Sequence, residues 1–330
     1  MVERVVSAVA IVLCVGLASA GCGGGSSGGG GAPASAVWTE ATASAGWSRR
    51  NNHAAVAYVS SMVVLGGADA SGALLNDVWS SGDGVTWTQE TASAGWPARE
   101  GHAVVVFNNE LWLMGGVGVG STPQNDIWVS DDATTWTLVT SSPAWSPRSE
   151  HQVHVLGGQM FLVGGMTASG FSEEVWSSSD GAVWTLVTSS ADFGPRESPA
   201  GAVHASKLWI TGGSDTSSGV AVRTNDVFDS TGGSLWIQRA APPWATRAAH
   251  AAAGFNGELW VLGGEGGSGE LNDVWSSSDG STWTRRTETA PWSARSFFKA
   301  VPFGNKLWVL GGTSNGVNSG SLNDVWSYTP

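Results

Sequence analysis

The sequence predicts an all-β protein, a six-bladed β-propeller whose blades have four strands each. Three features of the sequence lead to this fold. A double glycine recurs six times at steps of 48 to 51 residues, an arginine recurs at the same steps, and a large aromatic residue lies three positions before each arginine. The double glycines begin at Gly66, Gly115, Gly164, Gly212, Gly263 and Gly311, and the arginines are Arg50, Arg99, Arg148, Arg196, Arg247 and Arg295.

Each repeat is expected to form four short strands. The first strand, as in residues 102–107, is rich in Ala, Val and Gly, which suits the crowded inner position of a radial array. The second, residues 111–114, is apolar throughout, as expected for a strand covered on both faces. The third is residues 273–276 in repeat five, and the fourth begins near Trp283, after the turn at residues 278–280.

The two ends of the repeat array predict how the ring closes. The sixth repeat ends just past Tyr328, before a fourth strand. Residues 36–42 form an isolated fourth strand at the other end, and they closely match residues 182–188. We therefore expect the first strand of the folded body to complete the last blade, so that no open edge remains.

The N-terminal segment has the pattern of an export signal over residues 1–21, with an apolar run from Val5 to Leu17. The small residues before Cys22 resemble the lipobox of bacterial lipoproteins, which implies lipidation of Cys22; the alternative is ordinary secretion with cleavage near Ala20. Residues 22–35 then form a Gly/Ser-rich tether, and the propeller occupies residues 36–330. These features predict an exported, membrane-anchored lipoprotein of the bacterial envelope, periplasmic or on the cell surface.

Composition excludes some partners. The formal net charge is −12, whereas proteins that bind nucleic acid need a basic face, so a nucleic-acid partner is excluded and contact with a membrane is expected only through the anchor. The only cysteines are Cys14 and Cys22, so the body has no disulfide and packing alone must stabilise it. We expect the body to be a monomer.

The repeats resemble kelch repeats, through R-x-x-H at the start, L-W-V-x-G-G in the centre and N-D-V-W in the third strand. The resemblance covers about residues 37–330 and implies a propeller that binds other molecules through loops on its faces; a few kelch propellers are enzymes. Residues 277–283 also resemble the Asp box of sialidases, a structural motif that implies no activity.

The repeated charged residues are predicted to be structural, because a catalytic group rarely occurs six times. Each arginine is expected to pair with an acid that opens the third strand, within its own blade or the next. Histidines follow four of the arginines by three residues, at His53, His102, His151 and His250. Such histidines could bind a metal, but successive blades are too far apart for a shared ion, so no metal site is predicted. The six acids are Asp77, Asp126, Glu174, Asp226, Asp273 and Asp324.

Charged residues that break the repeat are the candidates for function. Glu100, Glu150 and Glu197 lie beside repeat arginines at the expected channel mouth. The candidates for a ligand-binding face are Asp69, Asp215, Glu265 and Lys299; the alternative for them is ordinary solvated loop charge.

We therefore expect a non-catalytic module that binds a protein or a glycan, without a cofactor. The alternative is a carbohydrate enzyme resembling the sialic-acid epimerases of six-bladed kelch type, which implies catalytic roles for Glu100, Glu150, Glu197, His102 and His151. A third alternative is a purely structural spacer. A deep pocket with converging carboxylates favours the enzyme, and a mouth lined by Ala and Ser favours binding. Tyr58 and Tyr328 are the only tyrosines, and neither suits the tyrosine chemistry of galactose oxidase or the sialidases.

Overall fold

The computed structural model describes residues 37–215, 220, 222–316 and 320–330. All regular secondary structure in these ranges is β-strand, which confirms the all-β prediction. None of the described residues forms a helix with the length and hydropathy of a membrane span. The predicted signal segment, Cys22 and the tether lie outside the described residues.

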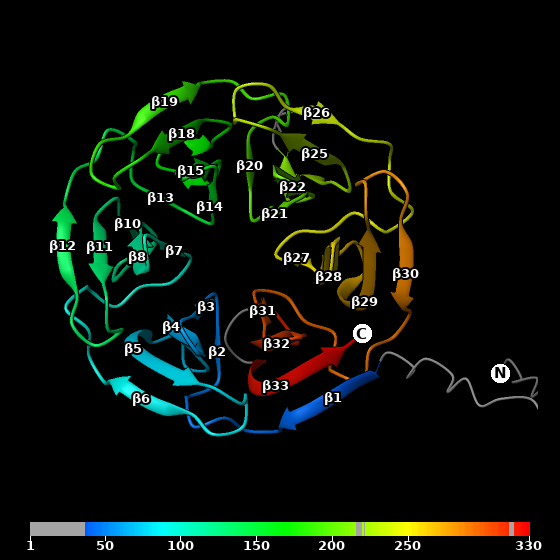
Figure 1. Cartoon of the computed structure of the whole chain (residues 1–330), viewed down its shortest axis with the longest axis horizontal. Coiled ribbons are helices and arrows are strands. Elements are labelled where there is room, and N and C mark those ends of the chain that lie inside the picture. The colour runs from blue at the N-terminus through cyan, green and yellow to red at the C-terminus, as the bar shows by residue number, and fades with distance from the viewer. Residues whose placement is uncertain (1–36, 216–219, 221, 317–319) are drawn as a thin grey trace, which may run out of the picture. The chain divides into compact units, whose positions relative to one another are not determined.

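Four sheets each contain four antiparallel strands in chain order, as expected for the blades of a kelch propeller (Figure 1). The first strand of each sheet follows a repeat arginine, and the second precedes the double glycine or contains it. The four sheets are β7(Ala103–Phe107), β8(Glu110–Met114), β11(Ile127–Ser130) and β12(Thr137–Thr140); β14(Gln152–Leu156), β15(Gln159–Val163), β18(Val175–Ser178) and β19(Thr185–Thr188); β21(Ala200–His204), β22(Lys207–Thr211), β25(Val227–Ser230) and β26(Ile237–Gln238); and β27(Ala251–Phe255), β28(Glu258–Gly266), β29(Gly269–Ser277) and β30(Thr284–Thr287).

The first and last repeats belong to one nine-stranded sheet. Its first part is β3(Ala54–Tyr58), β4(Ser61–Asp69), β5(Leu74–Ser81) and β6(Thr88–Thr91), and its second is β31(Lys299–Phe303), β32(Lys306–Thr313) and β33(Ser321–Thr329). The short strand β2(Arg50–Asn51) joins the two parts by pairing with β4 and β33. The strand β1(Val37–Thr42) pairs antiparallel with β33, from Val37 opposite Thr329 to Thr42 opposite Val325, so it occupies the fourth-strand position of the last repeat.

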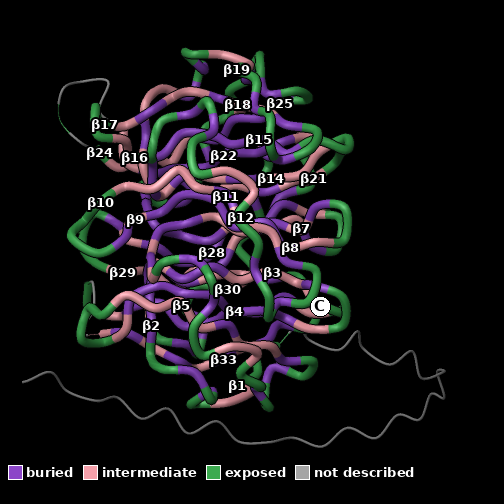
Figure 2. Tube along the Cα trace, turned by 90° about the vertical axis from the view of Figure 1, so that its left-hand side faces the viewer, coloured by how far each residue is buried: buried purple, intermediate pink, exposed green. Residues whose placement is uncertain are grey.

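The first strands of the sheets stand around one central space (Figure 1). Each contacts the first strand of the next repeat, in the order β3, β7, β14, β21, β27 and β31, and β31 contacts β3 again. Short strands in the loops beyond the double glycines project from one side, at the left of Figure 2. They are β9(Val117–Gly118), β10(Thr122–Pro123), β16(Met166–Thr167), β17(Gly170–Phe171), β23(Ser214–Asp215) and β24(Val222–Arg223), with β13(Arg148–Ser149) and β20(Arg196–Glu197) pairing beside them.

The hydrophobic core lies between neighbouring sheets, and β8 shows why its sequence is apolar on both faces. Leu111 and Leu113 pack in a cluster with Val63 and Leu65 of the preceding sheet. Trp112 and Met114 pack in a different cluster, which includes residues of β15 in the following sheet. Side chains alternate between the two faces of a strand, so β8 contributes to two cores. A polar side chain at any of these positions would face one of the cores.

The outer turns are fitted to the tryptophans of neighbouring sheets. The carboxylate of Asp279 accepts hydrogen bonds from the backbone N–H groups of Ser281 and Thr282, which lower its pKa to about 2. The turn places Gly280 against Trp209 of the preceding repeat, and a Cβ on Gly280, whose φ is +71°, would lie 2.1 Å from that ring. Only glycine allows this contact, which is why Asp-Gly recurs in the outer turns.

Deletion of residues 37–42 tests the pairing of β1 with β33. The deletion should expose the edge of β33 and remove the indole of Trp38, which is 8% exposed in the core of the last repeat and packs against Trp292 and Tyr328. We expect a lower melting temperature and concentration-dependent association, because an unpaired strand edge recruits other chains. Size-exclusion chromatography and thermal unfolding measure both, with deletion of residues 23–31 as the control. A truncated chain that stays monomeric and equally stable would contradict this pairing as a source of stability.

Candidate functional site

A buried arginine precedes the first strand of every repeat, and each of the six is at most 1% exposed. In repeat five, Arg247 donates from both terminal nitrogens to Asp273, at 2.8 Å each, and also donates to the carbonyl of Gly263 at 2.8 Å. The equivalent ion pairs lie within single repeats and are Arg50–Asp77, Arg99–Asp126, Arg148–Glu174, Arg196–Asp226 and Arg295–Asp324.

In repeat five the arginine keeps the pKa of its partner acid below the usual value. Burial raises the pKa of Asp273, but the hydrogen bond and the charge of Arg247, together with the indole N–H of Trp275, outweigh burial and leave the pKa below its usual value. A tryptophan donates to the acid in the same way in repeats one, two, three and six. In repeat four Phe228 takes the tryptophan position, and the hydroxyl of Thr224 donates to Asp226.

The asparagine before the acid links one repeat to the next, a role that the sequence analysis did not assign. The amide of Asn76 donates to the carbonyls of Ala94 and Trp96, both in the following repeat. Asn323 of the last repeat donates to the carbonyls of Ala45 and Trp47 of the first. The recurrence of Asn in N-D-V-W was the signal for this role. The same link is made by Asn125, Asn225 and Asn272.

A belt of backbone hydrogen bonds surrounds the central axis at the arginine end of the inner strands. Its members stand two residues after each arginine, and all have a positive φ between 47° and 62°. Backbone N–H groups donate to the preceding member's carbonyl in five of the six neighbouring pairs, and the sixth, Glu150 and Ser198, is joined through side chains at 3.3 Å. The belt consists of Asn52, Gly101, Glu150, Ser198, Ala249 and Phe297.

The three candidate glutamates gather at this belt. Glu150 is its one charged member, and its carboxylate accepts a hydrogen bond of 2.7 Å from the amide of Asn52, two repeats away. Burial, and then the charge of Glu150, raise the pKa of Glu100 and of Glu197. The three carboxylates therefore lie near one another at the belt, and none of them is among the described residues that line the central cavity described below.

The repeat histidines are buried between sheets. The imidazoles of His102 and His151 are 4% and 3% exposed, and their rings pack against Trp96 and Trp145. Burial is the largest cause that lowers both pKa values, that of His151 to about 3, so these rings are neutral. The ring of His102 also approaches Gly66 of the preceding repeat, where a Cβ would lie 2.9 Å from it. Both histidines also belong to the lining of the central cavity described below, with their rings packed against these tryptophans. His53 and His250 are equally buried.

The loop candidates are partly engaged within the protein. Asp69 accepts hydrogen bonds from the N–H and hydroxyl of Ser71 and from the N–H of Ala73, which lower its pKa and fix a turn. Glu265 forms an ion pair with Arg223 of the neighbouring repeat, a partner that the sequence analysis did not single out. Asp215 lies in β23 and is half-buried. Among the described residues no cluster of three or more His, Cys, Asp or Glu side chains could hold a metal ion.

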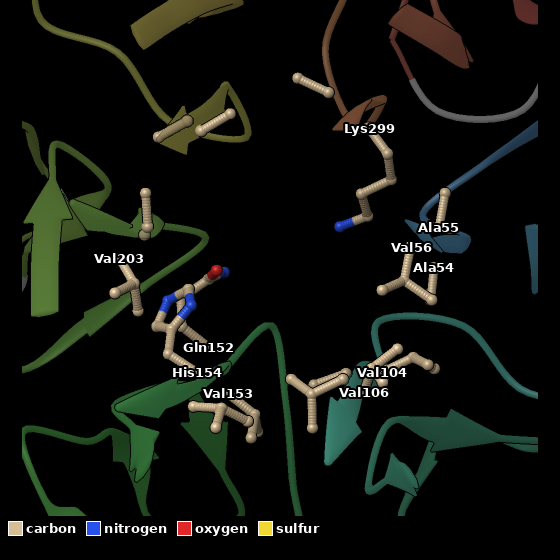
Figure 3. Close-up of a pocket in the computed structure, with 18 of the residues that line it drawn as sticks. Ala54, Ala55, Val56, Val104, Val106, Gln152, Val153, His154, Val203 and Lys299 are labelled. Carbon is tan, nitrogen blue, oxygen red and sulfur yellow. The ribbon is translucent and has the colours of Figure 1, made fainter. Parts of the chain in front are cut away.

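A cavity of about 410 Å³ lies between the inner strands (Figure 3). Its walls are mainly Ala, Val and Gly from all six repeats. Lys299 projects into it, and Gln152 and His154 stand on the opposite side. Gln152 and His154 were not singled out from the sequence, because a polar residue in an inner strand carries no signal of which way it points.

Two family models of kelch repeats match the sequence. Residues 33–213 match the KLHDC2/KLHL20/DRC7 Kelch-repeats domain, and residues 294–330 match the Kelch motif. No curated protein matches the chain.

Replacing Arg247 by Met tests the structural role of the repeat arginines. The substitution removes the charged donor of Asp273, which keeps the indole N–H of Trp275, and the arginine donor of the Gly263 carbonyl. We expect a loss of about 3 kcal/mol in the free energy of unfolding, the cost typical of breaking a buried ion pair on one side. Chemical denaturation measures the loss, and Arg285→Met on the exposed outer strand is the control. An Arg247→Met protein as stable as the control would show that the pair adds nothing.

Proposed function

The chain belongs to the kelch-repeat family, and on that basis we propose that residues 36–330 form a six-bladed propeller that binds another protein. Its binding surface is the face that carries the loops beyond the double glycines. The proposal of six blades rests on the closed cycle of contacts between inner strands and on the pairing of β1 with β33. Binding through loops suits a ring of rigid sheets, which leaves loop sequence free to vary.

Exposed apolar side chains on these loops carry the proposal. Val119, Met166 and Val222 belong to the loops of repeats two, three and four, and they are 81%, 40% and 53% exposed. They are in or next to the short loop strands at the left of Figure 2. Apolar residues on neighbouring projections gain free energy when a partner covers them, and such groupings mark protein-interaction sites.

The geometry supports binding more than catalysis. An epimerase-like reaction on a sugar requires carboxylates that face a pocket, but none of the described residues that line the central cavity is Asp or Glu. His102 and His151 do contribute to the lining, but their rings pack against Trp96 and Trp145, and burial keeps them neutral. A glycan ligand on the loop face remains the second candidate, since the ion pair of Arg223 and Glu265 offers polar groups there.

We further propose that the propeller is displayed on a bacterial envelope. The proposal rests on the residues before Cys22 and on the Gly/Ser-rich stretch that follows. A lipid on Cys22 would hold the loop face near partners at the membrane while the tether lets the propeller reorient.

Charged substitutions on the loops should abolish partner binding. The full-length chain, as wild type, as V119D/M166D and as V59D, is used to capture proteins from an envelope extract of the organism that makes it. We expect one protein whose recovery falls about tenfold or more with V119D/M166D, because charge in an apolar contact is costly. Val59 is 87% exposed at the other end of the inner strand, so V59D should retain the partner.

Equal recovery with all three proteins would overturn the protein-binding proposal. A glycan array probed with the same proteins then decides the second candidate, since glycan binding lost in V119D/M166D would assign the loop face to a carbohydrate ligand.

The anchor is tested by Cys22→Ala. The wild-type chain should incorporate radiolabelled palmitate and sediment with membranes, whereas the variant should do neither, because the acyl chains supply the membrane affinity. Membrane association that survives Cys22→Ala would contradict lipidation at this cysteine.

A further inference from the structure

Lys299 is the one Lys, Arg, Asp or Glu side chain among the described residues that line the central cavity. The histidines there are neutral, because burial lowers the pKa of His154 to about 4 and that of His151 to about 3. Figure 3 shows the Lys299 amine extending into the open space instead of lying along the wall. Lys299 forms no ion pair with another described residue, and none of the described residues that line the cavity has a carboxylate.

The position of Lys299 departs from its repeat. Lys299 is the first residue of its inner strand, and the equivalent first residues are alanines in every repeat except the third, which has Gln152. Repeats three and six are three steps apart in the cycle of six, so Lys299 and Gln152 face each other across the axis at the same level. An ammonium and an amide thus lie on opposite walls of a channel whose other lining residues are mainly Ala, Val and Gly, with His102, His151 and His154 among them.

Lys299 and Gln152 also mark one end of the cavity. A smaller cavity of about 70 Å³ shares both residues with the main one, so the two polar groups stand where the spaces meet. Beyond them, the inner strands continue toward their hairpin turns with Val56, Val106 and Val203 on the walls. The polar groups are therefore near the belt, and the apolar length of the channel extends away from it.

An unpaired ammonium in apolar surroundings is costly, and burial accordingly lowers the pKa of Lys299 while the charge of Glu150 in the belt partly opposes this shift. An anion that enters the cavity would remove that cost. A single amine with one amide opposite suits a monoanion, whereas a phosphate dianion requires more donors. Because the cavity walls are mainly apolar, the ligand also needs an apolar chain attached to its charged group.

We propose that the central channel binds a small monocarboxylate with an apolar chain, its carboxylate between Lys299 and Gln152 and its chain along the valines. The Gln152 amide already donates to the carbonyl of Pro199 at 2.9 Å, which fixes the orientation of its second N–H. This site is separate from the loop face, so it neither requires nor excludes a protein partner there.

Isothermal titration calorimetry of the purified full-length chain with hexanoate tests the site. We expect hexanoate to bind and hexanamide, which has the same chain without the charge, to bind about tenfold more weakly or worse. Lys299→Met, which keeps the length and removes the charge, should weaken hexanoate to the same degree. Lys306→Met is the matched control, because Lys306 lies over Trp308 and not on the cavity wall, and it should leave the affinity unchanged.

Absence of hexanoate binding to the wild-type chain would overturn the proposal, as would equal binding by Lys299→Met. Thermal unfolding of each variant establishes that it is folded, and Lys299→Gln replaces Lys299→Met should the latter fail to fold. The Glu150→Gln variant is an independent test. It removes a negative charge near Lys299, so it should bind hexanoate more tightly. Weaker binding by this variant would show that the carboxylate of hexanoate binds elsewhere.

Discussion

The buried guanidinium that begins each repeat is the interaction on which the rest of the fold depends. It joins three parts of one repeat: the acid of the third strand, the carbonyl of the first glycine after the second strand, and the loop that leads to the first strand. Arg247 shows all three, through Asp273, Gly263 and the carbonyl of Ala245. A positive charge fully removed from water requires an opposite charge and hydrogen-bond acceptors. In every repeat these are the acid and the carbonyl of the first glycine, so the arginine, the acid and the double glycine recur together.

The same arginines and double glycines also make contacts between neighbouring repeats. The second glycine donates its N–H to the arginine carbonyl of the next repeat, as Gly67 does to Arg99. Gly67 has a φ of +93°, and a Cβ there would lie 2.6 Å from the carbonyl oxygen of Asn51 in its own repeat, so this position requires glycine. The belt continues the link at the axis. Residues that hold the ring are thus repeated and buried, while those that break the repeat, such as Lys299 and the loop valines, are free to contact other molecules.

Much of the fold could be predicted from the sequence because its periodic signals have local causes. Small residues in the inner strands, apolar residues on both faces of the second strand and the fourth-strand pattern in residues 37–42 all correspond to observed strands and pairings. The all-β prediction and the kelch resemblance are confirmed. The belt could not be predicted, because backbone groups form it and its members range from Gly101 to Phe297. The cavity lining was missed for a related reason: which inner-strand side chains face the axis depends on the tilt of every sheet. Lys299 was singled out because it breaks the repeat, but its neighbour across the channel, Gln152, was not.

Hydrogen exchange of the belt amides tests most directly whether the repeats form one closed ring. The N–H of Asn52 donates to Phe297 across the junction between the first repeat and the last, whereas the N–H groups of Gly101, Glu150 and Phe297 donate between other neighbouring repeats. A closed ring predicts that all four amides exchange only through global unfolding, with the same protection free energy as the amides of β8. Faster exchange confined to Asn52 would show that the junction opens on its own, and that the repeats form an arc held together from neighbour to neighbour.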